Sequence, residues 1–256
     1  MDRLTLRTAI AEALEPYEFV RAAWEGGSAA FERDDEWSDI DLQVIAEPEH
    51  AEQVFDVAYE TIESLGGIGD LWRLPDPTWH GNRQAFIRPA TAPEHLMVDL
   101  VVIEAGGATP FQETEIHGRP TVFFDKDGVV GPTPFDRAAA RARMLEVLAT
   151  RRIEVRLFGH AADKGAARRN TVGAIDALHH WVLRPLHEAL RMLHVPDRWD
   201  WSTQYLRRDL PDEVADRLDA LWSVTDLDDV PATRAEAAAW FEQVAAEVEE
   251  REASGE

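Results

Sequence analysis

The hydrophobic pattern of this 256-residue chain changes near its middle, and the change limits which folds the chain can adopt. The first half mixes two periods, because amphipathic helices alternate with short strands. Helical spacing covers residues 2–15 and 49–65, ended by Pro16 and by Gly66-Gly67. Strands are predicted at residues 19–24, 40–45, 67–74, 84–88 and 96–103. These elements make an α/β or α+β unit of about 125 residues, an ordinary domain size.

From Phe135 onward the pattern is helical almost throughout. The spacing predicts helices at residues 134–159, 164–194, 211–222 and 231–252. Pro185 lies inside the second of these and should kink or split it. The tract 128–134 holds two prolines and is the expected boundary, so that residues 1–128 and 129–256 form separate domains.

Composition narrows the class of protein. Apolar residues make up 45% of the chain, enough to bury a sizeable core. The absence of cysteine excludes disulfides and thiolate metal sites. No apolar run approaches the ~20 residues that span a bilayer, and the N-terminal pattern is not that of a signal peptide. We therefore expect a cytoplasmic protein without a membrane partner.

The formal net charge is −23, which disfavours a nucleic acid as partner and favours a cationic substrate. Lys126 and Lys164 are the only lysines. Acid-rich, lysine-poor composition is also typical of a salt-adapted organism or a GC-rich genome. The acidity is thus compatible with a cationic substrate and does not establish one.

Two carboxylates share one face of a predicted strand. In Ser38-Asp39-Ile40-Asp41-Leu42, Asp39 and Asp41 are two positions apart, and such residues point the same way about 7 Å apart. Paired carboxylates suit Mg²⁺, which prefers oxygen ligands and is often shared with a phosphate. Acidic residues on an exposed strand face are also common, so this pair alone is weak evidence.

Asp99 is a more telling carboxylate. In the strand around it, residues 96–103, all the remaining positions are apolar, as in strands that are buried on both faces. An unpaired carboxylate there would cost several kcal/mol unless it is paired, neutralised or bound to a metal. The alternative is an aspartate at the rim of the strand, bonded to backbone.

Gly26-Gly27-Ser28 forms a third element of the pattern. Glycine lets the backbone approach a phosphate closely, and the serine hydroxyl and following N–H groups can bind it. Asp39 follows Ser28 by eleven positions. The combination of Gly27-Ser28, Asp39-x-Asp41 and Asp99 resembles the polymerase-beta-type nucleotidyltransferase superfamily, and the layout resembles its antibiotic nucleotidyltransferases of the aminoglycoside and lincosamide types.

This resemblance implies an α+β fold, in which a nucleotidyltransferase domain with a mixed sheet flanked by helices precedes an all-α helical bundle that closes over substrate and nucleotide. It implies that Asp39, Asp41 and Asp99 are catalytic and hold magnesium, with two ions expected. It also implies transfer of a nucleoside monophosphate, AMP from ATP or the equivalent from another NTP, to a hydroxyl of a small, aminoglycoside-like molecule. Pyrophosphate is released, and antibiotic resistance is the expected role.

The same resemblance assigns the phosphates to Gly27 and Ser28. Where many members have Ala-Arg-Gly after the serine, this chain has Ala30-Phe31-Glu32, so Arg33 is the substitute phosphate contact. Lys164, Arg168 and Arg169 form a small basic island that could neutralise the leaving group or simply form surface ion pairs.

Several alternatives remain open at this stage. The general base is Asp99, or else Glu94 or Glu104 at the ends of its strand. The acceptor could be a protein, as in AMP-transferring antitoxins. The chain could also be a non-catalytic nucleotide-sensing module, although such a module usually loses carboxylates. The pattern does not indicate an oligomeric state.

Overall fold

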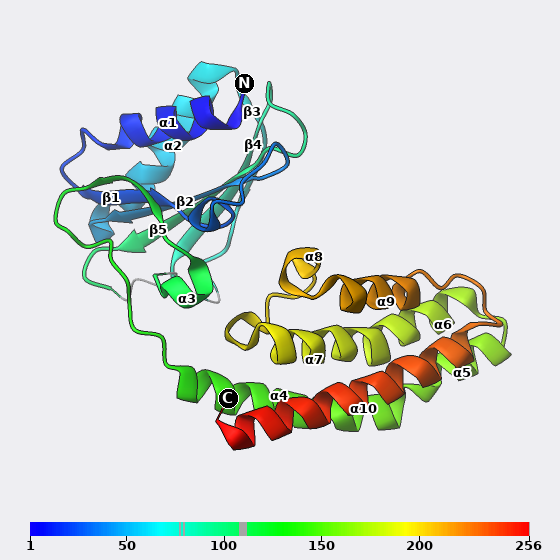
Figure 1. Cartoon of the computed structure of the whole chain (residues 1–256). Coiled ribbons are helices and arrows are strands. Elements are labelled where there is room, and N and C mark those ends of the chain that lie inside the picture. The colour runs from blue at the N-terminus through cyan, green and yellow to red at the C-terminus, as the bar shows by residue number, and fades with distance from the viewer. Residues whose placement is uncertain (77, 79, 108–111, 256) are drawn as a thin grey trace. The chain divides into compact units, whose positions relative to one another are not determined.

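The structure, a computed structural model, describes residues 1–76, 78, 80–107 and 112–255. It divides into two compact units, Met1–Phe135 and Asp136–Glu256, each with its own hydrophobic core (Figure 1). Across the described ranges, none of the helices is both long enough and apolar enough to cross a membrane.

The N-terminal unit is built on a six-stranded mixed sheet in the order β3-β4-β5-β2-β1-β6. The central pair β2/β5 is parallel, and every other neighbouring pair is antiparallel. The strands are β1 (Val20–Glu25), β2 (Ile40–Ala46), β3 (Ile68–Arg73), β4 (Arg83–Pro89), β5 (Val98–Glu104) and β6 (Thr121–Asp125).

Helices α1 (Arg3–Leu14) and α2 (Ala51–Leu65) cover one face of this sheet (Figure 1). Asp2 caps α1, because its carboxylate accepts a hydrogen bond from the Thr5 N–H at 2.9 Å. The predicted alternation along β2 is confirmed: Ile40, Leu42 and Val44 are fully buried in the helix-covered core. The opposite face therefore carries Asp41 and Gln43.

That opposite face has a smaller apolar cluster, which includes Trp24, Ile45 and Val101. Two elements on the way to the second unit were not predicted, the short helix α3 (Thr114–His117) and the edge strand β6. Gly26-Gly27-Ser28 opens only a 3-10 turn, η1 (Ala29–Phe31), and a second such turn, η2 (Pro48–His50), precedes α2. The first unit is thus the expected sheet with helices. Its helices α1 and α2 cover one face, and the opposite face carries Asp41 and Gln43.

The C-terminal unit is all α-helical, and its core is made by apolar side chains from most of its helices. The long helix α10 packs along α7, α5 and α4. The helical elements are α4 (Arg137–Phe158), α5 (His160–Ala167), α6 (Thr171–Leu178), the π-helical turn η3 (His179–Leu183), α7 (Arg184–His194), the 3-10 turn η4 (Pro196–Arg198), α8 (Leu206–Asp209), α9 (Asp212–Trp222) and α10 (Val230–Ser254). The chain is therefore an α+β protein, as predicted.

The prediction of one helix over residues 164–194 is wrong. Arg169 adopts a left-handed conformation, with φ of 54°, and Asn170 caps the next helix by accepting from the Gly173 N–H at 3.1 Å. A π-helical turn then precedes α7, whose first turn contains Pro185. Proline is tolerated there because a first-turn N–H has no helical partner. The predicted helix is thus interrupted next to Pro185, as expected. It also has a second interruption between α5 and α6, which capping by Asn170 explains.

Candidate active site

Three carboxylates meet where the central parallel strands begin. In the register of β2 and β5, Asp41 lies opposite Asp99, so that the two side chains share one sheet face on strands about 4.8 Å apart. Asp39 precedes β2 and is two positions from Asp41 on the same side of the chain. The pairing thereby brings Asp99 beside Asp41, and Asp39 is close enough to raise the pKa values of both, although it does not line the same pocket.

The electrostatics of these carboxylates show mutual repulsion. Burial, followed by the nearby charges of Asp39 and Asp99, raises the pKa of Asp41 to about 7. Burial also raises the pKa of Asp99 to about 6, against the opposing effect of a hydrogen bond from Gln84. Carboxyl groups that are costly to ionise together favour a proton or a cation between them.

The turn before η1 is shaped around Asp41. The Gly26 N–H donates to the Asp41 carbonyl at 2.9 Å. Gly27 has φ of +55°, and a Cβ on it would lie 1.6 Å from Asp41 Oδ2, so no larger residue fits here. Ser28 is 6% exposed, and its hydroxyl has no hydrogen-bond partner within the described part of the chain. The orphaned hydroxyl is itself buried, and Ser28 does not line the pocket that contains Asp41 and Asp99.

A pocket of about 270 Å³ opens beside these groups. It is lined by Gly27, Asp41 and Asp99 and by three side chains that sequence reasoning missed, His80, Gln84 and His117. Gln84 could have been found, because it is a polar residue within a predicted strand. His80 and His117 come from a loop and from α3, where no periodicity marks them. The pocket therefore combines carboxylates with imidazole and amide groups.

The carboxylate oxygens suit a hard divalent cation, although they do not form a complete coordination site in this structure. Among the residues that the structure describes, no group of three or more His, Asp or Glu side chains is in position to hold a metal ion. Asp99 Oδ1 is instead bonded to Gln84 Nε2 at 2.7 Å. The clustered carboxylate oxygens, with their negative charge and raised pKa values, are the chemistry that suits Mg²⁺.

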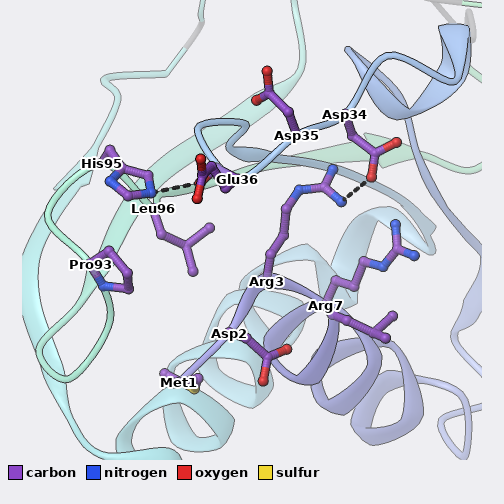
Figure 2. Close-up of a pocket in the computed structure, with 11 residues that line it drawn as sticks. Met1, Asp2, Arg3, Arg7, Asp34, Asp35, Glu36, Pro93, His95 and Leu96 are labelled. Atoms are coloured by element: carbon purple, nitrogen blue, oxygen red, sulfur yellow. Dashed lines mark hydrogen bonds and ion pairs between the residues drawn. The ribbon is translucent and has the colours of Figure 1, made fainter.

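An ion-pair network supports Asp39 from the helix-covered face. Arg3 Nε donates to the Asp39 carbonyl at 3.0 Å, and Arg3 and Arg7 both bind the carboxylate of Glu25, which is fully buried. Arg3 also pairs with Asp34 at 3.1 Å (Figure 2). The two arginines are four positions apart on α1 and hence on one helix face. The network fixes the backbone from which Asp39 projects.

A larger pocket, of about 810 Å³, lies at the start of α1 (Figure 2). It is lined by the first turn of α1, by Asp34 to Glu36 and by His95, which contacts the Glu36 carbonyl at 2.7 Å. None of the three clustered aspartates lines it. Size alone therefore does not make it the site of chemistry.

The other predicted residues lie as follows. The Arg33 N–H donates to the Ser28 carbonyl at 3.0 Å, and its guanidinium lies 5.3 Å from the centre of the Phe31 ring. In the C-terminal unit, Lys164 is on α5 and Arg168 caps its end, both with exposed side chains.

The alternative bases are exposed. Glu104 ends β5, five residues beyond Asp99 or about 16 Å along the strand, and lies 3.8 Å from Arg83. Glu94 is in the loop before β5. Neither lines the pocket that contains Asp99. Of these three carboxylates, Asp99 is therefore the one that lines the pocket.

Comparisons with known proteins give the following likenesses. No family model matches the chain, and no curated protein matches it in sequence. Among solved structures, the chain is similar to an aminoglycoside 6-adenyltransferase from Bacillus subtilis, with 16% identity and a TM-score of 0.37 over 97% of this chain and 90% of that one. It is also similar to the GLD-2/RNP-8 complex, with 12% identity and a TM-score of 0.32 over 88% of this chain and 66% of that one.

At these identities and TM-scores, a functional conclusion has to depend on the residues of the site and not on the likeness.

Proposed function

We propose that this protein is a magnesium-dependent nucleotidyltransferase of the cytoplasm, which transfers AMP from ATP to a hydroxyl of a small molecule and releases pyrophosphate. One observation carries the proposal: Asp41 and Asp99 lie opposite each other on parallel strands, with Asp39 beside them and the Gly27 turn packed on Asp41. A half-buried cluster of like charges destabilises the metal-free fold, and carboxyl groups with raised pKa values are common at functional sites.

In this proposal, Asp39 and Asp41 would hold the ion that accompanies the triphosphate, and Asp99 would join them in holding a second. Bound Mg²⁺ would supply charge neutralisation at the phosphate oxygens and at the attacking oxygen. Ser28 would donate its unpartnered hydroxyl to a phosphate oxygen, with Arg33 as a further contact.

Asp99 would accept the proton of the acceptor hydroxyl as that oxygen attacks the α-phosphorus. In the metal-free protein burial raises the pKa of Asp99 to about 6, so the group is ionised near neutral pH. The site residues thus bind the nucleotide, orient the acceptor and remove one proton.

An aminoglycoside-like cation is the acceptor that we propose. The net charge of −23 and the exposed acids Asp34, Asp35 and Glu36 support it, since they would attract amines. A protein acceptor remains the alternative enzyme function, and nucleotide sensing without turnover the non-enzymatic one.

The C-terminal helical unit is proposed to bind substrate and nucleotide, with Lys164 and Arg168 contacting phosphate. Replacing either by alanine should raise KM for ATP. Lys126→Ala is the matched control, because it removes the other lysine of the chain, which bonds the Tyr17 carbonyl. An unchanged KM in both variants of the helical unit would contradict this role.

The test of the function is to incubate the protein with Mg²⁺, each labelled NTP and a panel of aminoglycosides while following pyrophosphate. Release that requires a small acceptor is the expected result. Label on protein would support the alternative enzyme, and nucleotide binding without any turnover would support the sensing module.

A further inference from the structure

A chain of hydrogen bonds runs from the loop before β4 to the carboxylate of Asp99. The Asn82 N–H donates to His80 Nδ1 at 3.2 Å, His80 Nε2 lies 3.0 Å from Gln84 Oε1, and Gln84 Nε2 donates to Asp99 Oδ1 at 2.7 Å. His80, Gln84 and Asp99 all line the 270 Å³ pocket. The chain therefore ends at the carboxylate that the proposed reaction uses as base.

The direction of this chain follows from hydrogen-bond chemistry. A backbone amide can only donate, so His80 Nδ1 accepts and the hydrogen of the neutral ring is on Nε2. The Nε2–H must then donate to the oxygen of the Gln84 amide, which turns the amide nitrogen toward Asp99. His80 thus selects one of the two orientations that the amide could adopt.

Gln84 is held rigidly. Its side chain is 8% exposed, and β4 pairs with β5 so that Phe86 lies opposite Asp99 and Gln84 is one step along the same face. Gln43, equally buried on β2, has an amide oxygen without a partner in the described ranges. The two hydrogen bonds of the Gln84 amide therefore do not follow from burial alone. They result from its position between His80 and Asp99.

We propose that Gln84 is a positioning residue, oriented by His80, that holds Asp99 through Oδ1 and directs Oδ2 toward the acceptor hydroxyl. The inference rests on the proposed function and names Gln84 as the residue that holds the proposed base, Asp99, in place. Displacement of a reacting group by about 1 Å can lower a rate about 10²-fold, so an amide that fixes a carboxylate matters most to kcat.

The test uses the full chain with Gln84→Glu and Gln84→Leu. Gln84→Glu keeps the acceptor for His80 and loses the donor to Asp99, whereas Gln84→Leu loses both bonds. We expect kcat to fall about 10- to 100-fold in both while KM for ATP stays within about 2-fold. Gln112→Met is the matched control, because it removes a buried amide outside the pocket whose nitrogen has no partner in the described residues.

Loss of activity through general damage is separated by two measurements. Circular dichroism should show that both Gln84 variants keep the wild-type fold, although the added carboxylate of Gln84→Glu is expected to lower its Tm because it lies among like charges. In an Asp99→Asn background, Gln84→Leu should lower the residual rate no further, because residues that act through one another are not additive.

A second readout does not depend on turnover. Nitrogen-15 NMR of the wild-type protein should show the Nε2–H form of the His80 ring, and the Gln84 side-chain amide proton should shift in Asp99→Asn. A ring with its hydrogen on Nδ1, or a kcat of Gln84→Leu within about 2-fold of an active wild type, would overturn the inference. A wild type that turns over no nucleotide with any acceptor removes the proposed function and this inference with it, even if NMR finds the hydrogen bonds.

Discussion

The two units bury charge in opposite ways. In the N-terminal unit, Asp41 and Asp99 face each other, and the pKa values of both are raised. In the C-terminal unit, the guanidinium of Arg191 is fully buried but donates to Asp209 at 3.0 Å and to the carbonyls of Arg198 and Gln204, both at 3.0 Å. The first arrangement gathers like charges, whereas the second satisfies one charge completely.

This difference distinguishes a candidate ligand-binding site from a structural ion pair. A buried ion with full hydrogen bonding holds segments of a fold together and needs no ligand. A cluster of carboxylates raises the energy of the empty protein, and a cation lowers it. Glu25 shows that the distinction is local, because it is buried in the same unit as the cluster but is paired with Arg3 and Arg7.

The largest expected effect is on turnover. Asp39→Asn and Asp41→Asn should each lower kcat by roughly 10³- to 10⁴-fold, since each removes a charged ligand from a site whose ions supply several kcal/mol. The measurement is pyrophosphate release, with circular dichroism to establish that the fold is retained. A protein that carries both substitutions and remains active would contradict the comparison of the two units, because turnover would then not require the carboxylates of Asp39 and Asp41.

The next effect is on stability in the C-terminal unit. Asp209→Ala should destabilise that unit by about 3–5 kcal/mol, because it leaves Arg191 buried without its counter-ion. Hydrogen exchange of the α7 peptides measures this apart from the N-terminal unit. A loss well below 1 kcal/mol would mean that the two carbonyls alone satisfy the guanidinium.

The units should also respond to pH with opposite signs, first through His187. Burial, followed by Arg191 and Arg184, lowers the pKa of this 3% exposed histidine to about 4. Since the unfolded ring has a pKa near 6.5, the stability from its neutral form is present above that pH and lost as pH falls toward 4, by about 3 kcal/mol. Urea unfolding should show a steeper loss from pH 7 to pH 4 in wild type than in His187→Phe, which keeps a ring beside Trp222. Equal slopes in the two proteins would contradict this assignment.

The smallest effect concerns Asp99 without metal. Its folded pKa of about 6 exceeds the unfolded value, so its contribution to stability is present below pH ~4 and lost as pH rises through 6. Asp99→Asn should therefore be more stable than wild type at pH 8 without Mg²⁺, by about 1 kcal/mol, because the half-buried group keeps some contact with water. Added Mg²⁺ should raise the Tm of wild type more than that of the variant. A variant less stable than wild type would contradict this expectation, because it would show that the charge of Asp99 stabilises the metal-free fold.

Much of the site could be predicted because its signals are local. The alternation along residues 40–45 predicts which side of β2 carries Asp41, and the apolar strand around Asp99 marks that carboxylate as unusual. The break at Asn170 was missed, because one capping residue outweighs a helical period that continues on both sides of it. His80 and Gln84 were missed because their role depends on partners that sequence spacing does not reveal.

The sequence by itself determined the faces: side chains two positions apart on a strand point the same way, whatever that strand pairs with. The tertiary structure alone decided the neighbours. Asp41 and Asp99 are 58 positions apart in the chain, and they share a site only because β2 and β5 pair in parallel in one particular register. A shift of one residue would turn Asp99 to the opposite face, among the helices, and burial of the apolar face prevents that shift.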